Sequence, residues 1–244
     1  MKKFTPASVV LTVVLVGSPT FSGQVLAQQF VSDPLEPVNT KVHAFNQFMD
    51  KHFLLPVARG YRKYIPGPAR QGVSNFFSNI GDISVLANNL LQMKLEAAAN
   101  DTGRIMINTT IGIGGLLDVA TAIGFTPNDE DFGQTLGYWG IGTGPYIVLP
   151  LFGPSTLRDA IGFSVDTATN PISHQDNVRI RNSAFALEQL DKRVDAMSVE
   201  SLITGDPYIF MREAYLQQRE YLVNDGQANQ DWDQEWDWDY MRDP

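Results

Sequence analysis

The sequence predicts an all-α fold with irregular apolar loops, on three observations. Apolar residues recur at helical spacing in several segments, which is typical of amphipathic helices. Asp33 and Pro34, and again Asp206 and Pro207, precede two of these segments, and this pair suits the cap and first turn of a helix. Between them, residues 132–157 carry no charge but are rich in glycine and proline. That stretch is too apolar for an ordinary solvent loop and too broken for a membrane-spanning helix.

Bulk composition restricts the class of partner and the chemistry. The chain has 244 residues and a formal net charge of -9, and a mature chain without Lys2 and Lys3 would be more acidic still. Nucleic acid is therefore not expected as a partner, because phosphate binding needs clustered lysine and arginine. The chain contains no cysteine, so disulfides, thiol nucleophiles and cysteine-ligated metals are excluded.

The amino terminus has the pattern of an export signal. Lys2 and Lys3 precede a short apolar run at residues 9–16, and residues 25–27 form a small-residue cleavage site. The apolar run is too short for a membrane anchor helix. The sequence therefore predicts a signal peptide over residues 1–27.

The first two predicted helices follow in order. One starts at Asp33, runs for about five turns with one apolar face, and is expected to stop or bend at Pro56. A second starts at the turn of residues 65–68, with a break expected near Gly81. Residues 92–107 are expected to continue it, because they are rich in strong helix formers.

The middle of the chain is apolar and then acidic. Residues 111–125 are dotted with glycine over a length shorter than a bilayer span needs, and these small residues would let neighbouring segments approach closely. Residues 126–131 form a polar loop with three carboxylates. A calcium site is one interpretation of this cluster. A solvated turn is the preferred one, because the ligand spacing and the glycine of a calcium loop are missing.

Three further helices are expected in the second half of the chain. Ser155 or Thr156 is expected to cap the first, and residues 182–199 form the second. The third starts after Asp206 and is expected to end near Asn224.

The remaining residues, 225–244, have a different composition. They are strongly acidic and hold Trp232, Trp236 and Trp238, from which no apolar core can be built. We predict an acidic, tryptophan-rich mobile tail. Two roles stay open for it: a docking peptide for a basic partner, or a tail that is simply solvated.

Catalytic and cofactor signatures are missing from the sequence. It has no Gly-x-Ser-x-Gly nucleophile elbow, no His-Glu-x-x-His zinc motif and no glycine loop followed by a phosphate-binding lysine. Residues 140–145 superficially suggest a phosphate cradle, but Pro145 removes a backbone donor. His43, His52 and His174 do not form a metal pair. The sequence therefore predicts no catalytic residue, no metal site and no cofactor.

Arg158 and Asp159 are the first charged residues after the uncharged stretch. One interpretation is a polar gate at the mouth of an apolar passage, since charge next to such a region usually faces water or a cavity. The other is a helix cap with a surface ion pair that contributes little. Both stay open at this point.

Several motifs resemble the MlaA (VacJ) family of bacterial outer-membrane proteins. They cover residues 33–224 in order and include several long, specific segments. The motifs are Asp33-Pro-Leu-Glu36, Asn39, Phe45-Asn46, Tyr64-Ile-Pro-Gly-Pro-Ala-Arg70, Asn75-Phe76, Asn108-Thr-Thr-Ile-Gly-Ile-Gly-Gly-Leu-Leu-Asp118, Phe132-Gly-Gln-Thr-Leu-Gly137, Gly144-Pro-Tyr146, Leu149-Pro150, Leu157-Arg158-Asp159, Asp206-Pro-Tyr-Ile209 and Arg212-Glu-Ala-Tyr215.

The resemblance implies a single helical, ring-like, membrane-embedded domain over residues 28–224. It implies a non-catalytic protein on the periplasmic side of the outer membrane, with an amphipathic channel. Such a protein removes mislocalised phospholipids from the outer leaflet and passes them to a soluble periplasmic lipid carrier (MlaC-like), which maintains lipid asymmetry. Trimeric porins of the outer membrane are the implied membrane partners, and phospholipid is the cargo.

The resemblance also implies where the channel lies. The residues that would line, flank or hinge it are those of the glycine-rich segment together with the charged pair that follows: Gly137, Tyr138, Trp139, Gly140, Gly142, Gly144, Pro145, Tyr146, Arg158 and Asp159. Tyrosine and tryptophan suit a membrane interface. The glycines would supply tight turns and some mobility.

One position departs from the family pattern. Typical members are lipoproteins with a Leu-Val-Gly-Cys box, whereas this chain has Ser18 at the cysteine position. Serine cannot carry the thioether-linked lipid, so the resemblance does not extend to lipid anchoring. Either Ser18 is a natural loss, with cleavage after Ala27, or it was introduced. Membrane retention would then depend on amphipathic helices and a porin.

Two other function classes are compatible with the same motifs. One is a periplasmic scaffold that docks porin and lipid carrier without passing lipid. The other is a lipid hydrolase, which the absent nucleophile motifs disfavour.

Overall fold

The computed structural model describes residues 33–200 and 203–226, and within them the all-α prediction is confirmed. The predicted signal peptide, residues 1–27, and the predicted tail beyond Gly226 lie outside the described residues. The elements in chain order are α1 (Glu36–Met49), the π-helical turn η1 (Asp50–Leu54), α2 (Leu55–Tyr64), α3 (Gly67–Leu91), α4 (Leu95–Thr110), α5 (Val119–Ala122), α6 (Phe132–Tyr138), β1 (Tyr146–Leu149), β2 (Gly153–Thr156), α7 (Leu157–Thr169), the 3-10 helix η2 (Pro171–His174), α8 (Val178–Ala196) and α9 (Pro207–Val223).

The first helix starts later and runs further than expected. The Asp33 carboxylate accepts the Leu35 N–H at 3.0 Å and closes a turn, after which α1 begins at Glu36. Pro56 does not stop the chain, because it lies in the first turn of α2, where a missing N–H costs little. The irregularity is instead the π-helical turn η1 just before it, which joins α1 to α2.

The predicted break near Gly81 is wrong. The helix predicted for residues 92–107 is largely confirmed as α4 (Leu95–Thr110), but it does not continue α3. α3 runs through Gly81 to Leu91 without interruption. The chain turns at residues 92–94, where Met93 adopts a left-handed conformation with φ 61°, before α4 begins. Strong helix formers therefore did not keep the two segments in one helix. Polar contacts, Asn89 with Asp101 and Asp82 with Arg104, instead stabilise α3 and α4 packed side by side.

The uncharged stretch of residues 132–157 is not an irregular loop throughout. It begins as α6, and its second half forms an antiparallel hairpin in which Tyr146 pairs with Thr156 and Leu149 with Gly153. The strand β1 reads Tyr-Ile-Val-Leu, a run of aromatic and branched residues that suits a strand. Pro145 and Pro150 flank that run, which is why the sequence resembled a loop.

The capping predictions for the later helices are largely confirmed. The Thr156 hydroxyl accepts the Asp159 N–H at 3.2 Å and starts α7. Asp206 accepts the Tyr208 N–H at 2.8 Å and starts α9, which ends before Asn224. α8 begins at Val178, earlier than predicted, because Asn177 caps it.

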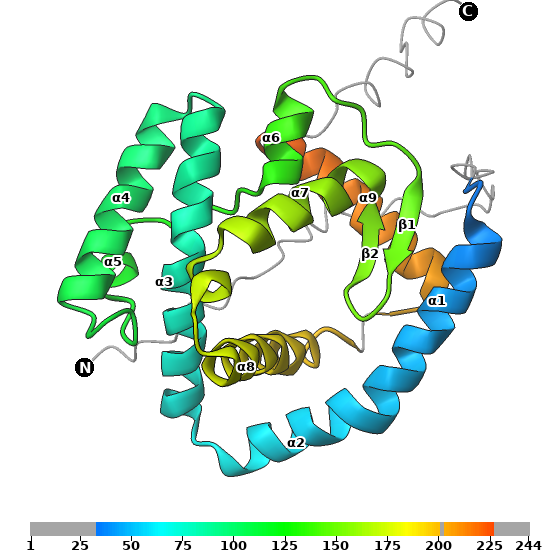
Figure 1. Ribbon diagram of the computed structural model, residues 1–244, viewed down its shortest axis with the longest axis horizontal. Coiled ribbons are helices and arrows are strands. Elements are labelled where there is room, and N and C mark those ends of the chain that lie inside the picture. The colour runs from blue at the N-terminus through cyan, green and yellow to red at the C-terminus, as the bar shows by residue number, and fades with distance from the viewer. Residues whose placement is uncertain (1–32, 201–202, 227–244) are drawn as a thin grey trace, which may run out of the picture. The chain divides into compact units, whose positions relative to one another are not determined.

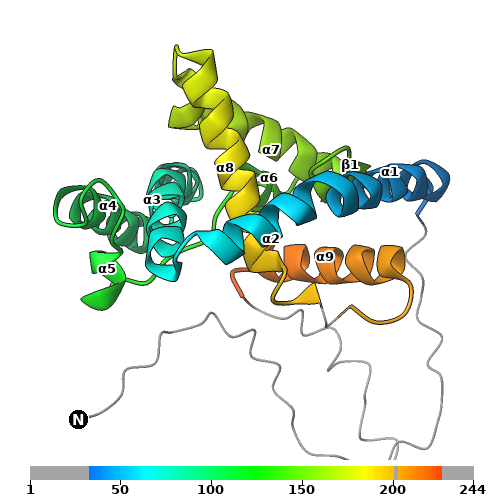
Figure 2. The ribbon, with the colours of Figure 1, turned by 90° about the horizontal axis from the view of Figure 1, so that it is seen from below.

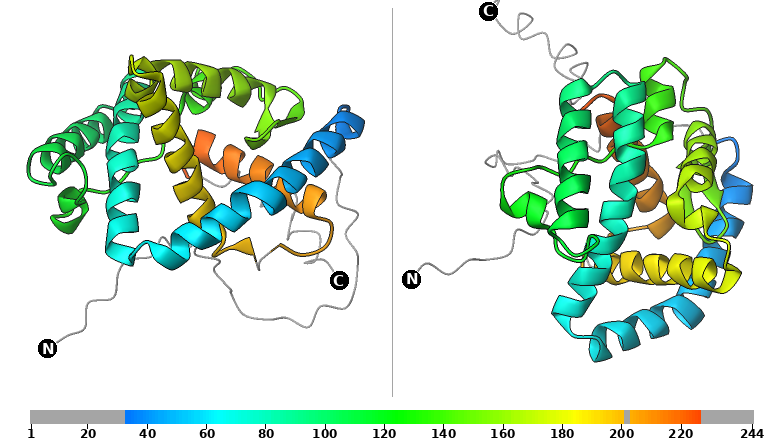
Figure 3. Two further views of the ribbon diagram at one scale, coloured as in Figure 1. Left: turned by 60° about the horizontal axis from the view of Figure 1, so that its bottom comes forward. Right: turned by 60° about the vertical axis from the view of Figure 1, so that its left-hand side comes forward.

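The helices form two groups of contacts, one through α3 and α8 and the other through α6 (Figure 1). α3 contacts α4 and α8, and α2 also contacts α8. α6 packs against α7 and α9, and the hairpin contacts α1 through β1 and α9 through β2. Figures 2 and 3 show that α8 stands at a steep angle to α2 although the two are in contact.

The interior of this part of the chain is polar rather than apolar. Among the described residues, eight hydrophobic side chains are buried but eighteen polar or charged ones are. A small apolar core of Tyr146, Val148 and Tyr208 joins β1 to α9. Large apolar side chains are instead exposed, including Phe48 and Phe53, at 54% and 58%. Soluble proteins show the opposite distribution, so the outer face is suited to an apolar surrounding.

Among the described helices, none combines the length and the apolar character that crossing a bilayer requires.

Close packing of α6 on α7 depends on Gly162. A Cβ atom at this position would lie 2.3 Å from the backbone N of Gly133. We expect Gly162→Ala to lower the free energy of unfolding by about 1–3 kcal/mol, because the two helices must separate. Gly60→Ala is the matched control: Gly60 is also helical but has open space around its Cβ position, so alanine should be neutral or slightly stabilising. Urea unfolding in detergent measures both, and equal effects would contradict the prediction.

Candidate functional site

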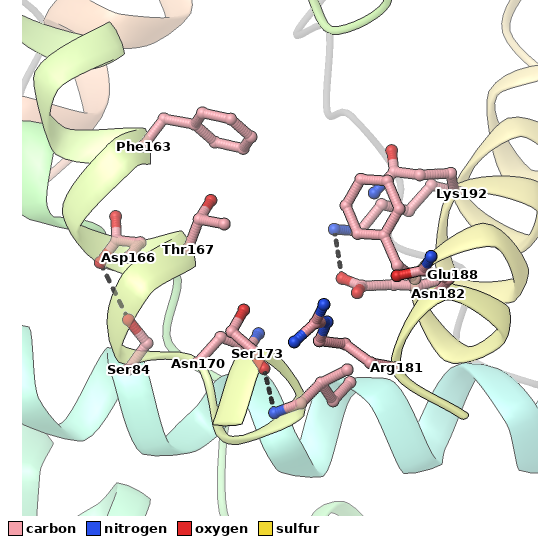
Figure 4. A pocket seen from close by; sticks show the side chains of 13 residues that line it. Ser84, Phe163, Asp166, Thr167, Asn170, Ser173, Arg181, Asn182, Glu188 and Lys192 are labelled. Atoms are coloured by element: carbon pink, nitrogen blue, oxygen red, sulfur yellow. Dashed lines mark hydrogen bonds and ion pairs between the residues drawn. The ribbon is translucent and has the colours of Figure 1, made fainter. Parts of the chain in front are cut away.

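Three adjoining cavities have volumes of about 350, 390 and 310 Å³; α3, α7 and α8 line the first two, and the hairpin, α7, α8 and α9 line the third. Asp166 of α7 and Lys192 of α8 line all three, so the cavities meet around these two side chains. We name them the first, second and third central cavity, in that order. Figure 4 shows the first, with side chains from α7 and α8 facing each other across it.

One wall of the first central cavity is polar and hydrogen-bonded. The Asp166 carboxylate accepts from Ser84 Oγ at 2.9 Å, from Asn88 Nδ2 at 3.2 Å and from the Phe132 N–H at 2.9 Å. Burial raises the pKa of Asp166, and these hydrogen bonds only partly offset that cost. α7 is thereby tied to α3 and to the start of α6.

The opposite wall carries α8 and combines charge with aromatic rings. Lys192 forms an ion pair with Glu188 one helical turn away, at 2.7 Å. Phe185 of α8 and Phe163 of α7 both line the cavity, and each packs against the ring of Phe152 from the hairpin. The central cavities therefore offer charged groups and apolar surface side by side.

Acidic residues dominate the second central cavity. Its lining residues include eight Asp or Glu and a single cationic residue, Lys192. Burial raises the pKa of four of them, Asp82, Asp129, Asp166 and Asp191. A cavity with this charge balance attracts cationic groups and repels anions.

A buried charge network supports the third central cavity. Arg219 of α9 donates to Asp159 at 2.9 Å and to Asp131 at 3.0 Å, and Arg158 donates to Asp159 at 3.0 Å. Tyr215 Oη donates to the same Asp159 carboxylate at 2.8 Å. Burial opposes ionisation of Asp159, but the hydrogen bonds and charge of Arg219 outweigh it and hold its pKa below the ordinary value.

Comparison with known proteins identifies the family. A family model described as "MlaA lipoprotein" matches residues 31–222. Two curated relatives named "Intermembrane phospholipid transport system lipoprotein MlaA" come from Shigella flexneri and Escherichia coli (strain K12). They are 36% and 35% identical to this chain over 206 residues, which is 82% of each protein compared.

The chain belongs to the MlaA family.

A solved structure shows the same fold. It is reported as "Structural basis for maintenance of bacterial outer membrane lipid asymmetry" and matches with a TM-score of 0.70 at 36% sequence identity. The match covers 79% of this chain and all of the solved one. This chain and the solved structure therefore share one fold.

The structure places the charged pair of this MlaA-family chain inside the fold. Arg158 and Asp159 are 5% and 6% exposed, so the interpretation as a surface ion pair is wrong. The helix cap is confirmed, but Asp159 also lines the third central cavity and is bound by Arg219. Whether the pair gates a passage stays a prediction.

The glycine-rich segment lies apart from the three central cavities. Tyr138, Trp139, Gly140, Gly142 and Gly144 are exposed, and none of them lines those cavities. Gly140 and Gly144 have φ of 85° and 68°, which agrees with tight turns. Their role as channel lining or hinge stays a prediction.

The remaining members of the predicted set have structural partners. Gly137 contacts the Arg158 side chain closely, since a Cβ there would lie 2.9 Å from Arg158 Nη1. Pro145 precedes β1, and Tyr146 is buried in the apolar core with Tyr208. These residues hold the hairpin and α6 in place.

The acidic loop of residues 126–131 is more than a solvated turn. Glu130 pairs with Lys94 at 2.8 Å, Asp131 with Arg219, and Asn128 donates to Asp101 at 2.7 Å. Within the described ranges no group of His, Asp or Glu is arranged to hold a metal ion. The loop instead joins α4, α9 and the turn between α3 and α4.

Sequence reasoning missed Asp166, Lys192 and Arg219. The sequence did contain a signal for Asp166 and Arg219: charged residues, rather than apolar ones, recur at helical spacing. Asp159 and Asp166 are seven residues apart on α7, as are Arg212 and Arg219 on α9, so each pair lies on one helix face. In a fold with a polar interior, these faces point inward.

The depressed pKa of Asp159 predicts a specific pH dependence. A carboxyl group with a lowered pKa stabilises the fold above its ordinary value of 3.8, and this contribution is lost as the pH falls through the folded-state pKa. The free energy of unfolding of the wild type should therefore exceed that of Asp159→Asn by the largest amount at about pH 6 and by less at about pH 3. These two pH values lie on either side of the ordinary aspartate pKa of about 3.9. Urea unfolding at both pH values measures the difference, and an unchanged difference would refute this origin.

Proposed function

We propose that this chain is a non-catalytic phospholipid transport protein of the outer membrane. It removes mislocalised phospholipids from the outer leaflet through an amphipathic channel and passes them to a soluble periplasmic lipid carrier (MlaC-like). Lipid asymmetry of the membrane is thereby maintained. The proposal is supported by membership of the MlaA family and by relatives named for intermembrane phospholipid transport.

The observation that carries this proposal is the inverted distribution of polarity. Eighteen polar or charged residues are buried while large apolar side chains face outward, and three cavities lined by both charged and apolar side chains adjoin one another. An amphipathic lipid has the matching requirement: its headgroup needs a polar path and its acyl chains need apolar surface. Charged groups beside aromatic rings in the first central cavity supply both.

Membrane attachment follows from the exposed apolar residues. Phe45, Phe48, Phe53 and Val57 are between 46% and 58% exposed along α1, η1 and α2. Such a face can lie in the interface of a leaflet or against another membrane protein. We place the protein on the periplasmic side of the outer membrane, with a trimeric porin as its membrane partner.

A deletion strain tests the main proposal. Loss of the protein should raise the amount of phospholipid in the outer leaflet, and the wild-type chain should restore the normal level. Fractionation should place the mature chain with the outer membrane. Unchanged surface phospholipid, or a chain recovered entirely with soluble proteins, would refute the proposal. Release of lysophospholipid or fatty acid by the purified protein would favour a hydrolase.

A bulky substitution separates a channel from a scaffold. Thr167 lines the first central cavity from α7, so Thr167→Trp should obstruct it and abolish rescue of the deletion strain. Thr169→Trp is the matched control, because Thr169 is exposed on the same helix and lines none of the three cavities. Full rescue by Thr167→Trp would favour a scaffold that docks porin and carrier without passing lipid.

A further inference from the structure

Two side chains of opposite charge line the first central cavity without an ionic partner among the described residues, and the Asp166 carboxylate is directed toward Ser84 (Figure 4). The Arg181 side chain on α8 makes no hydrogen bond or ion pair with any residue that the structure describes. Asp166 on α7 accepts three hydrogen bonds from uncharged donors but has no ion pair within the described ranges. Figure 4 shows the two residues on opposite sides of the cavity. A ligand that carries one anionic and one cationic group would bind both.

The surroundings of Asp166 favour a cationic group in the part of the ligand that lies next to this residue. Asp166 also lines the second central cavity, where acidic residues outnumber the single lysine eight to one. That lysine, Lys192, is already paired with Glu188. An ammonium group entering from the first cavity would gain attraction from this acidic wall, whereas a net anionic headgroup would be repelled.

Arg181 suits the anionic end of the ligand. A guanidinium binds phosphate through two parallel N–H donors, and its charge does not depend on pH in the ordinary range. Asn170 and Ser173, which line the same cavity beside Arg181 in Figure 4, offer further polar groups for phosphate oxygens. The apolar rings of Phe163 and Phe185 border this polar set and supply surface for the first carbons of acyl chains.

We propose that the first central cavity selects zwitterionic phospholipids with an amine headgroup over anionic ones, with Arg181 binding the phosphate and Asp166 the ammonium. This inference rests on the proposed transport function and adds a headgroup class to it. Phosphatidylethanolamine has the required charges, while phosphatidylglycerol carries the phosphate without a compensating ammonium. Selection arises from the fixed charges of the cavity and needs no conformational change.

A competition assay with the full-length protein in detergent tests the inference. Native mass spectrometry would compare bound lipid after mixing with equal amounts of phosphatidylethanolamine and phosphatidylglycerol. A third lipid, N-acetylated phosphatidylethanolamine, keeps the shape and the phosphate but loses the ammonium. We expect about a tenfold preference for phosphatidylethanolamine over both, which corresponds to about 1.4 kcal/mol.

Variants assign the preference to the two residues. Arg181→Gln should weaken binding of all three lipids, because each carries a phosphate, and Asp166→Asn should remove the preference for the ammonium. Arg179→Gln is the matched control, since Arg179 is exposed on the same helix and lines none of the three cavities. Because Asp166→Asn also alters three hydrogen bonds, a far-ultraviolet spectrum and a melting curve accompany it. The comparison of lipids on the wild-type protein does not depend on that variant.

The outcomes separate this inference from the transport function. Equal binding of all three lipids, or a preference for phosphatidylglycerol, would overturn the headgroup selection while leaving transport intact. A preference that survives in both Arg181→Gln and Asp166→Asn would also overturn it. Failure of the wild-type protein to bind any phospholipid, with no effect of the deletion on surface lipid, would refute the transport function itself.

Discussion

Arg219→Met is expected to lower the free energy of unfolding by about 3 kcal/mol, because it removes charged hydrogen bonds from Asp131 and from the buried Asp159, which keeps only Arg158 as a cation. The Arg219 side chain is 9% exposed and binds Asp159, which is 6% exposed, at 2.9 Å. It also binds Asp131 at 3.0 Å and so joins α9 to α7 and to the start of α6. Methionine keeps the length of the side chain but supplies no donor.

Two further variants test the origin of this effect. Arg179→Met removes an exposed arginine and should change stability by less than about 0.5 kcal/mol. Asp131→Asn in the Arg219→Met background should recover part of the loss, because the structure gives Asp131 no other cation among the described residues, whereas Asp159 keeps Arg158. Urea unfolding in detergent, followed by circular dichroism, measures all three. A loss below about 1 kcal/mol for Arg219→Met would show that water reaches the network.

Asn39→Ala is expected to cost about 2–5 kcal/mol and to loosen the hairpin. The Asn39 side chain is 2% exposed, donates to the Tyr146 carbonyl at 3.0 Å and accepts the Val148 N–H at 2.9 Å. Alanine would leave both backbone groups of β1 buried without a partner, and each such group costs about 1–3 kcal/mol. Asn39 thus occupies the edge of β1 where a third strand would otherwise pair.

Asn46 provides the internal comparison. It lies seven residues further along α1, donates to the Leu149 carbonyl at 2.9 Å and accepts the Leu151 N–H at 2.7 Å. It is only partly buried, so Asn46→Ala should cost less, about 1–2 kcal/mol, because water can replace the lost partner. Hydrogen exchange should show faster exchange at Val148 in Asn39→Ala and at Leu151 in Asn46→Ala. A Val148 amide that stays protected in Asn39→Ala would contradict the role assigned to this side chain.

Where a local signal specifies an element, the sequence predicted it well. The caps Thr156 and Asp206 were identified before the start of α7 and α9, because a cap depends on a side chain and an N–H two or three residues away. The turn before α3 was also recognised from its prolines. Family motifs, which depend on the order of residues, identified the MlaA family without any knowledge of packing.

The central cavities could not be derived in this way. Asp166 binds Ser84, Asn88 and the Phe132 N–H, and Arg219 binds Asp131 and Asp159, contacts that join residues 34 to 88 positions apart. A search for apolar helix faces does not detect such groups, because it assumes that apolar residues point inward. In this protein the inward faces are polar, and the ordinary pattern is inverted.

The sequence by itself determined the helical class, the local caps and the family, since all of these depend on short segments and their order. Tertiary structure decided the rest. The hairpin β1–β2 forms between two prolines because Asn39 and Asn46 of α1 satisfy its outer edge. Arg158 and Asp159 form a neutral pair that is buried rather than exposed, and Arg219, sixty residues beyond Asp159, donates further hydrogen bonds to the same carboxylate and joins it to Asp131. A buried charge is stable only with partners, and here one of the two arginines that bind Asp159 is supplied by a distant helix.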